Sequence, residues 1–162
     1  MSDASEDCYT AAMRILQFRW NSAAELRRKL RKKQFDDEAI AATLERLQRE
    51  KWLDDDRFAG ALVRTHVRKR HGRLRIAAEL GAAGVSREAV AKAIDEHVDP
   101  KAERAGAVAA GTKKLASLLR RHGAEFAETP EARQKLSGFL QGQGYETGMV
   151  IEVVRELLRS KD

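Results

Sequence analysis

Basic side chains, rather than a catalytic set, are the residues whose types and spacing indicate chemistry in this chain. Lysine and arginine recur on three segments expected to be helical, on the side opposite the apolar residues. Both bind phosphates and carboxylates, and arginine can donate two parallel hydrogen bonds to either. Taken singly, each is explained by a solvated surface charge, whereas the set of patches favours an anionic partner. The candidate binding residues are Arg27, Arg28, Arg31, Lys32, Arg64, Arg68, Lys69, Arg70, Arg73, Arg75, Lys113, Lys114, Arg120 and Arg121.

No residue pattern typical of an enzyme or a metal site accompanies these basic patches. The acidic run 54–56 has no histidine nearby and is better explained as the start of a helix. His66 and His71 are five residues apart, which does not suit two metal ligands on one helix face. Cys8 is the only cysteine and has no histidine close in sequence, so a catalytic thiol is not indicated. We therefore expect no enzymatic activity, no cofactor and no metal.

An apolar frame that occurs three times is expected to position the basic faces. In its clearest copy a helix ends at Gly84, where glycine accepts a left-handed backbone, and Ser86 caps the next helix. Val85 lies between them, placed to contact Leu80 before the turn and Val90 after it. The spacing of Leu80, Val85, Val90 and Ile94 is repeated by Leu30, Phe35, Ile40 and Leu44, and by Leu140, Tyr145, Val150 and Val154. A frame repeated in this way predicts a helical array.

Helix-start signals divide the array into three repeats of three helices. The predicted repeats are residues 1–52, with 1–7 frayed, then 53–98 and 99–162. In the third repeat, Gly106 and Gly111 weaken a long helix expected to end at His122, so we expect a kink or fraying there. Trp20, Trp52 and Phe139 are expected to pack in the core or between repeats, rather than to stack on bases. The expected N-cap residues are Ser22 or Asn21, Asp36, Asp54, Ser86, Asp99 and Thr129, with Glu146 as a weaker candidate before the last helix.

Composition agrees with an all-α protein. The 162 residues are 35% charged and 43% hydrophobic, with only two prolines, and they lack the period-two alternation typical of strands. The acidic N-terminus has no signal-peptide pattern, and no apolar run reaches membrane-spanning length. A single cysteine suits a reducing compartment, so we expect a cytoplasmic protein without membrane contact. The net charge of +6 favours an anionic partner.

Three segments carry a resemblance to a known family. Residues 12–30 resemble the opening of the RecX family, and residues 52–59 (Trp-Leu-Asp-Asp-Asp-Arg-Phe-Ala) resemble its second repeat. Gly72, Ile76, Glu79, Leu80 and the pair Gly84-Val85 continue that match, and residues 135–145 resemble the third repeat. Together these segments cover nearly the whole chain in the family's order. One departure is Gln34, which stands where the family usually has glycine.

The resemblance implies a non-catalytic regulator of the RecA recombinase. The implied fold is three tandem three-helix repeats forming an elongated, curved array, present as a monomer. The implied partner is the RecA–DNA filament, with inhibition of ATP hydrolysis, strand exchange and coprotease activity in DNA repair and recombination. Single- or double-stranded DNA is a second implied partner. The leading alternative is a helical-repeat protein that acts directly on DNA, and another is a general helical scaffold for other proteins.

Overall fold

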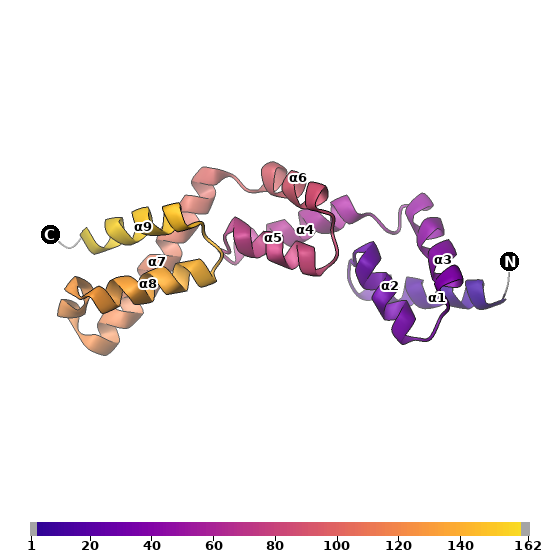
Figure 1. Ribbon diagram of the computed structural model, residues 1–162, viewed down its shortest axis with the longest axis horizontal. Coiled ribbons are helices and arrows are strands. Elements are labelled where there is room, and N and C mark those ends of the chain that lie inside the picture. The colour runs from indigo at the N-terminus through magenta and orange to yellow at the C-terminus, as the bar shows by residue number, and fades with distance from the viewer. Residues whose placement is uncertain (1–2, 160–162) are drawn as a thin grey trace. The chain divides into compact units, whose positions relative to one another are not determined.

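The prediction of an all-α fold is confirmed. The computed structural model describes residues 3–159, and within them the chain forms nine α-helices and one 3₁₀ helix, with no strand (Figure 1). The 3₁₀ helix, η1, was not predicted. The elements are α1 (Asp3–Phe18), α2 (Ala23–Lys32), α3 (Asp37–Arg49), α4 (Asp55–Arg68), α5 (Arg73–Ala82), α6 (Arg87–His97), α7 (Pro100–His122), η1 (Ala124–Glu128), α8 (Pro130–Gly142) and α9 (Thr147–Arg159).

Two long helices differ from what the sequence indicated. Of residues 1–7, expected to be frayed, residues 3–7 belong to α1, and residues 1 and 2 lie outside the described range. Helix α7 is continuous from Pro100 to His122. Its glycines lie where other helices approach: a Cβ atom at Gly111 would lie 2.6 Å from a methyl of Leu157, and one at Gly106 would lie 3.2 Å from the Tyr145 hydroxyl. These glycines therefore allow close packing without breaking the helix.

Six of the predicted N-caps are confirmed. In each case a side-chain oxygen accepts a hydrogen bond from the backbone N–H three residues later, at 2.7–3.2 Å. Each bond satisfies one of the N–H groups that a helix start leaves without an internal partner. The capping residues are Ser22, Asp36, Asp54, Ser86, Asp99 and Thr129.

The three repeated turns adopt the predicted geometry. Gly84, Gly144 and Gln34 have positive φ angles of 79°, 91° and 67°. In the first of these turns the N–H of Val85 donates to the carbonyl of Leu80 at 3.1 Å, and the corresponding bonds in the other turns are 3.3 and 3.4 Å. This bond is the defining contact of a Schellman helix end. Local sequence therefore determines where α2, α5 and α8 stop.

The described residues pack as two compact units, which we consider separately. Within the described residues, unit 1 comprises 3–62 and 79–93, and unit 2 comprises 63–78 and 94–159, so α4, α5 and α6 are divided between them. The core of unit 1 includes Leu26, Leu30, Ile40 and Leu47, each fully buried. The core of unit 2 includes Leu136, Leu140, Val150 and Val153 from α8 and α9. Burying each such side chain contributes roughly 1.5–3 kcal/mol.

In unit 1 the turn at Gly84 closes on the start of α2. Ser22, which caps α2, also donates its hydroxyl proton to the carbonyl of Ala83. A Cβ atom at Gly84 would lie 2.3 Å from the Cβ of Ala24, so the contact requires glycine at this turn. The hydroxyl that begins α2 therefore also binds the turn between α5 and α6.

Unit 2 repeats this contact between the turn at Gly144 and the start of α5. The N–H of Gly72 donates to the carbonyl of Gln143 at 2.8 Å, and the N–H of Leu74 donates to the carbonyl of Gly144 at 3.0 Å. A Cβ atom at Gly144 would lie 2.4 Å from the backbone nitrogen of Arg75. The α8–α9 turn thus satisfies N–H groups at the start of α5 that lack a partner within their own helix.

Candidate functional site

The candidate basic residues are distributed over both units. In unit 1, Arg27, Arg28, Arg31 and Lys32 are exposed on α2. The remaining candidates belong to unit 2, where most are exposed and Arg73, Arg75 and Lys114 are partly buried. They comprise Arg64 and Arg68 on α4, Lys69 and Arg70 in the α4–α5 turn, Arg73 and Arg75 on α5, and Lys113, Lys114, Arg120 and Arg121 on α7.

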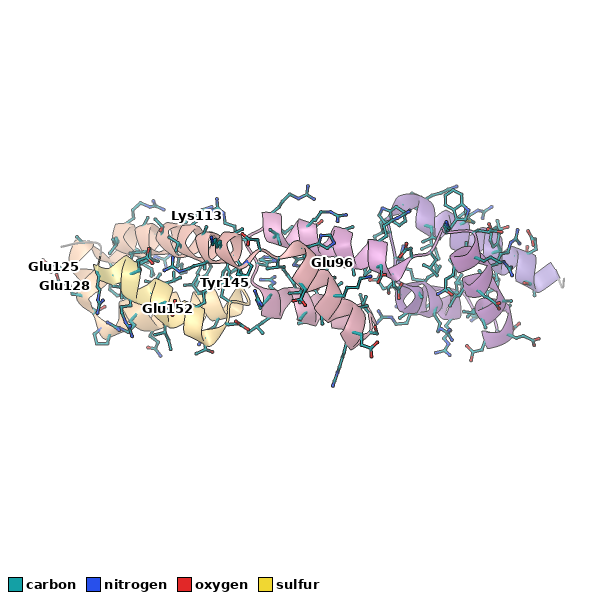
Figure 2. All side chains as sticks on the ribbon, turned by 90° about the horizontal axis from the view of Figure 1, so that it is seen from above. Glu96, Lys113, Glu125, Glu128, Tyr145 and Glu152 are labelled. Carbon is teal, nitrogen blue, oxygen red and sulfur yellow. The ribbon has the colours of Figure 1, made fainter. Side chains whose placement is uncertain are left out.

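Four of these residues come together in unit 2. Lys69 and Arg70 from the α4–α5 turn, with Lys113 and Lys114 from α7, line an open groove of about 380 Å³. We call it the cationic groove. Figure 2 labels Lys113 on α7 and Tyr145 in the α8–α9 turn. The remaining lining residues are Ala110, Ser117, Phe139 and Gln143.

Backbone geometry and one buried tyrosine position the wall that carries Lys69 and Arg70. Arg70, in the α4–α5 turn, has a φ of 58°, the left-handed conformation also found at the three repeated turns. The Tyr145 hydroxyl donates to the carbonyl of Arg70 at 2.6 Å. Because Tyr145 is only 1% exposed, this bond ties the turn to the core of unit 2. The groove therefore has a supported backbone beneath flexible cationic side chains.

The groove is electrostatically one-sided. No carboxylate is among its lining residues, and within residues 3–159 none of its four cations forms an ion pair. The ammonium of Lys114 lies 5.4 Å from the ring centroid of Phe139, where the ring face attracts it. Unpaired cations around a concave surface raise the local concentration of anions. The groove is therefore suited to phosphate groups or to a strongly acidic protein surface.

Other candidates are engaged within the chain itself. The Arg73 guanidinium forms a salt bridge at 2.8 Å with Glu103, whose side chain is 2% exposed. Arg31 pairs with Asp37 at 2.8 Å, and Arg28 donates to the carbonyl of Ala82 at 3.1 Å. The contact with Glu103 gives Arg73 a structural role, so we omit Arg73 from the surface proposed below.

Replacing Tyr145 with phenylalanine is expected to change how stability depends on pH. Burial raises the pKa of the Tyr145 hydroxyl to about 12, whereas the ordinary value is about 10. Between these values an unfolded chain loses the proton while the folded chain keeps it, so this stabilisation is complete below about pH 10 and declines toward pH 12. The lost hydrogen bond should lower the unfolding free energy by about 1 kcal/mol near neutral pH.

Denaturant unfolding of both proteins at about pH 9 and about pH 11 measures this effect. The stability difference between the wild type and Tyr145→Phe should shrink at the higher pH. A difference that stays constant would mean that Tyr145 ionises equally easily in the folded and unfolded states.

The structure brings two histidines together at the end of α4. The Nδ1 atoms of His66 and His71 lie 2.9 Å apart, because His71 lies in the α4–α5 turn and not on the same helix face as His66. In the described part of the chain, no group of three or more histidine, cysteine or acidic side chains could hold a metal ion. Cys8, expected near a frayed end, is buried within unit 1, and burial raises the pKa of its thiol. Among residues 3–159 no helix is both long and apolar enough to cross a membrane.

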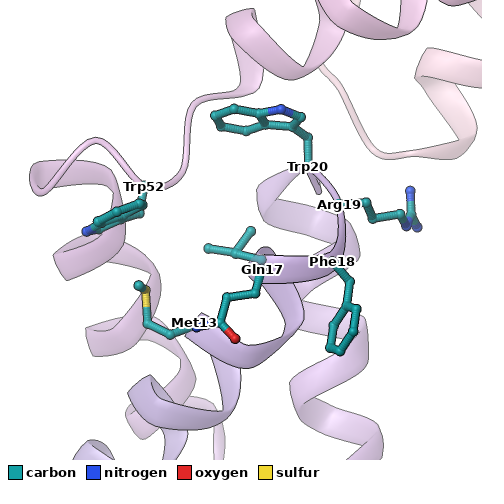
Figure 3. Close-up of a pocket in the computed structure, with 7 residues that line it drawn as sticks. Met13, Gln17, Phe18, Arg19, Trp20 and Trp52 are labelled. Carbon is teal, nitrogen blue, oxygen red and sulfur yellow. The ribbon is translucent and has the colours of Figure 1, made fainter.

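The aromatic residues expected to be packed show a mixed outcome. Phe139 packs against the core of unit 2 as expected. The expectation was wrong for Trp20 and Trp52, which are 46% and 53% exposed (Figure 3). Trp20 follows the end of α1 and Trp52 follows the end of α3, where sequence periodicity no longer tells which side faces the core. Sequence reasoning therefore missed a second candidate surface.

Comparison with known proteins agrees with this architecture. A family model described as RecX, first three-helix domain, matches residues 8–47, and one described as RecX, second three-helix domain, matches residues 54–94. A protein named Regulatory protein RecX from Pelodictyon phaeoclathratiforme is 34% identical over 150 residues, covering 92% of this chain and 88% of that protein. A protein of the same name from Amycolatopsis mediterranei is 33% identical over 157 residues, covering 96% and 83%.

Solved structures share the fold. The crystal structure of RecX from Lactobacillus salivarius superposes with a TM-score of 0.80 at 20% identity, covering 97% of this chain and 98% of that one. A second, described as the crystal structure of regulatory protein RecX, gives a TM-score of 0.78 at 19% identity, covering 98% and 73%. At these identities the likeness supports the fold alone.

Proposed function

The chain belongs to the RecX family, and from this we propose that it regulates the RecA recombinase by binding the RecA–DNA filament. The observation that carries the proposal is similarity, along 92% of the chain, to a relative named as a regulatory protein. We expect binding to suppress ATP hydrolysis, strand exchange and coprotease activity. The protein acts by binding, as a cytoplasmic monomer without a cofactor.

We propose the cationic groove as a contact with the filament. Its four cations have no ion-pair partner among the described residues, so an incoming phosphate or carboxylate displaces water rather than an internal partner. The exposed Arg27 and Lys32 of α2 form a second, smaller basic surface in unit 1. Lys69 and Lys113 are the best residues for a test, because both are exposed and neither supports the core.

A titration of RecA on single-stranded DNA with ATP tests both proposals. Wild-type protein should inhibit ATP hydrolysis at stoichiometric or lower amounts. The double variant Lys69→Glu, Lys113→Glu should need at least about tenfold more protein, because two attractive contacts become repulsive. Lys101→Glu is the matched control, an exposed lysine on α7 outside the groove, and it should behave like the wild type. If the wild-type protein does not inhibit ATP hydrolysis, the regulator proposal is wrong. If all variants inhibit ATP hydrolysis as the wild type does, the cationic groove is not a contact with the filament.

Direct action on DNA is the second candidate, because a groove lined by cations without carboxylates also suits a nucleic-acid backbone. DNA binding by the protein alone should weaken steeply with salt, and each lysine that contacts a phosphate should contribute roughly one unit to the salt slope. A filament regulator should instead require RecA for tight binding. Affinities measured with and without RecA over a range of salt concentrations separate the two.

A further inference from the structure

The four cations of the cationic groove surround one confined space. Lys69 and Arg70 belong to the α4–α5 turn and Lys113 and Lys114 to α7, yet all four line the same opening of about 380 Å³. Pockets that hold small molecules have volumes in this range. The groove therefore has the size of a small-ligand site, in addition to the charge of a surface that contacts a large partner.

The helices that build the groove supply no free counter-charge. Helices α7 and α8 each contain a single acidic residue, Glu103 and Glu131. Glu103 forms a salt bridge with Arg73 at 2.8 Å, and Glu131 forms one with Lys135 at 3.3 Å. The positive charges around the groove therefore add up, and a concave surface lined by charge of one sign concentrates the opposite ions.

This concentration of charge favours an anion with several phosphates close together. Arginine can donate two parallel hydrogen bonds to a phosphate, and lysine acts on it as a compact charge. One phosphate group is too small to engage four such side chains. In a polyphosphate chain, neighbouring phosphorus atoms share a bridging oxygen, whereas in a nucleic-acid strand a nucleoside separates them. Linked phosphates therefore bring the most negative charge into a small space.

The neutral lining of the groove also suits a small ligand. Ser117 and Gln143 can donate hydrogen bonds to phosphate oxygens, and Ala110 and Phe139 form an apolar part beside the cations. Small-molecule sites commonly combine an apolar lining with a few polar groups that fix the orientation of the ligand. Phosphates at the cations and a nucleoside at Phe139 would use both parts.

The fold holds the groove in shape before any ligand binds. The Tyr145 hydroxyl donates to the carbonyl of Arg70 at 2.6 Å, and the Gly72 N–H donates to the carbonyl of Gln143 at 2.8 Å. These bonds join the α4–α5 turn to the end of α8. Because folding already brings the cations together, a ligand does not have to order the backbone that carries them.

We propose that the cationic groove binds a chain of linked phosphates, as found in a nucleoside triphosphate or in inorganic polyphosphate. Lys69, Lys113 and their two basic neighbours neutralise the chain. The ligand occupies the cations that we assign to the filament contact, so it acts as a soluble competitor of filament binding. This competition rests on the proposed function, whereas the ligand site itself does not.

Calorimetric titration of the wild-type protein with tripolyphosphate, without RecA or DNA, tests the ligand site. Tripolyphosphate should bind at least about tenfold more tightly than orthophosphate at the same ionic strength, because one additional charge-assisted hydrogen bond suffices for that difference. Equal affinities would show that the cations act as independent surface charges, and the inference would be wrong.

Variants at two exposed lysines locate the binding. The double variant Lys69→Gln, Lys113→Gln should lose at least about tenfold in affinity for tripolyphosphate. Lys101→Gln, at an exposed position of α7 outside the groove, is the matched control and should bind like the wild type. Tripolyphosphate should also raise the unfolding temperature of the wild type more than that of the double variant, because it binds the folded state. Equal affinities of the control and the double variant would overturn the inference.

ATP distinguishes the two sources of linked phosphates. Tighter binding of ATP than of tripolyphosphate would identify a nucleoside triphosphate, with its nucleoside beside Phe139. Equal binding would identify the phosphate chain alone as the ligand, and binding of neither would contradict the proposal.

Release of labelled protein from the RecA–DNA filament tests the competition. At constant ionic strength and free Mg²⁺, tripolyphosphate should release the protein and orthophosphate should not. If the titration succeeds and no release occurs, the competition is wrong and the ligand site stands. If the titration fails, inhibition of RecA by the wild type would still support the regulator proposal.

Discussion

Gly144→Ala is expected to lower the free energy of unfolding by about 2–5 kcal/mol. An alanine Cβ would lie 2.3 Å from the Cβ and 2.4 Å from the backbone nitrogen of Arg75, so the α8–α9 turn would have to move away from α5. That movement would break the bonds from the Gly72 and Leu74 N–H groups to the turn. The positive φ of 91° at Gly144 adds strain for any residue with a Cβ.

Two substitutions isolate the cause of that loss. Gly142→Ala, two residues earlier at the last position of α8, meets no atom within 4 Å and should be neutral or stabilising by about 0.5–1 kcal/mol. Gln34 occupies the equivalent of Gly144 with a φ of 67° and is exposed, so Gln34→Ala should be nearly neutral. Denaturant unfolding measures all three. If Gly144→Ala cost no more than Gln34→Ala, the close approach to Arg75 would have no energetic importance.

Glu103→Ala is expected to lower the unfolding free energy by about 3 kcal/mol. Its carboxylate accepts from the Arg73 backbone N–H at 2.8 Å and from the Arg73 guanidinium at 2.8 and 2.9 Å. Glu103 is buried and Arg73 is 28% exposed, so removing the carboxylate leaves a partly desolvated cation and a helix-start N–H without their partner. Breaking a buried pair from one side is costly for this reason.

The neighbouring surface pair provides the control. Arg104 and Glu156 also form an ion pair from α7, but each side chain is nearly half exposed. Glu156→Ala should therefore cost less than about 1 kcal/mol. Thermal or denaturant unfolding compares the two variants under the same conditions. Similar losses in both would show that burial does not strengthen the contact between Arg73 and Glu103.

The parts of the fold that sequence predicted are those set by neighbouring residues. A cap such as Ser86 and a Schellman turn such as Gly84 depend on side chains within one helical turn, so spacing alone locates them. Gln34 adopts the same turn without glycine, because the apolar frame around it supplies the rest of the signal. The start of α1 was missed, because the acidic segment 3–7 was expected to be a frayed end.

The sequence predicted which residues could bind an anion, but not that four of them meet in the cationic groove. Lys69 and Lys113 were both candidates, but their convergence depends on the α8–α9 turn holding the α4–α5 turn through Tyr145. Arg73 looked equivalent to its neighbours, and only the fold pairs it with Glu103. Periodicity also fails just beyond a helix end, so the exposure of Trp20 could not be read from sequence. Contacts over long sequence distances account for the first two of these cases.

The division of α4, α5 and α6 between the two units has a practical consequence for deletion experiments. Neither unit is one continuous stretch of chain, so no single cut releases either of them whole. A protein shortened before α7 would lose the carboxylate that pairs with Arg73, and one shortened before α8 would lose the turn that binds α5. Inactivity of such fragments would report misfolding before it reported a lost binding surface. Point substitutions at exposed lysines are therefore the dependable way to map what this protein binds.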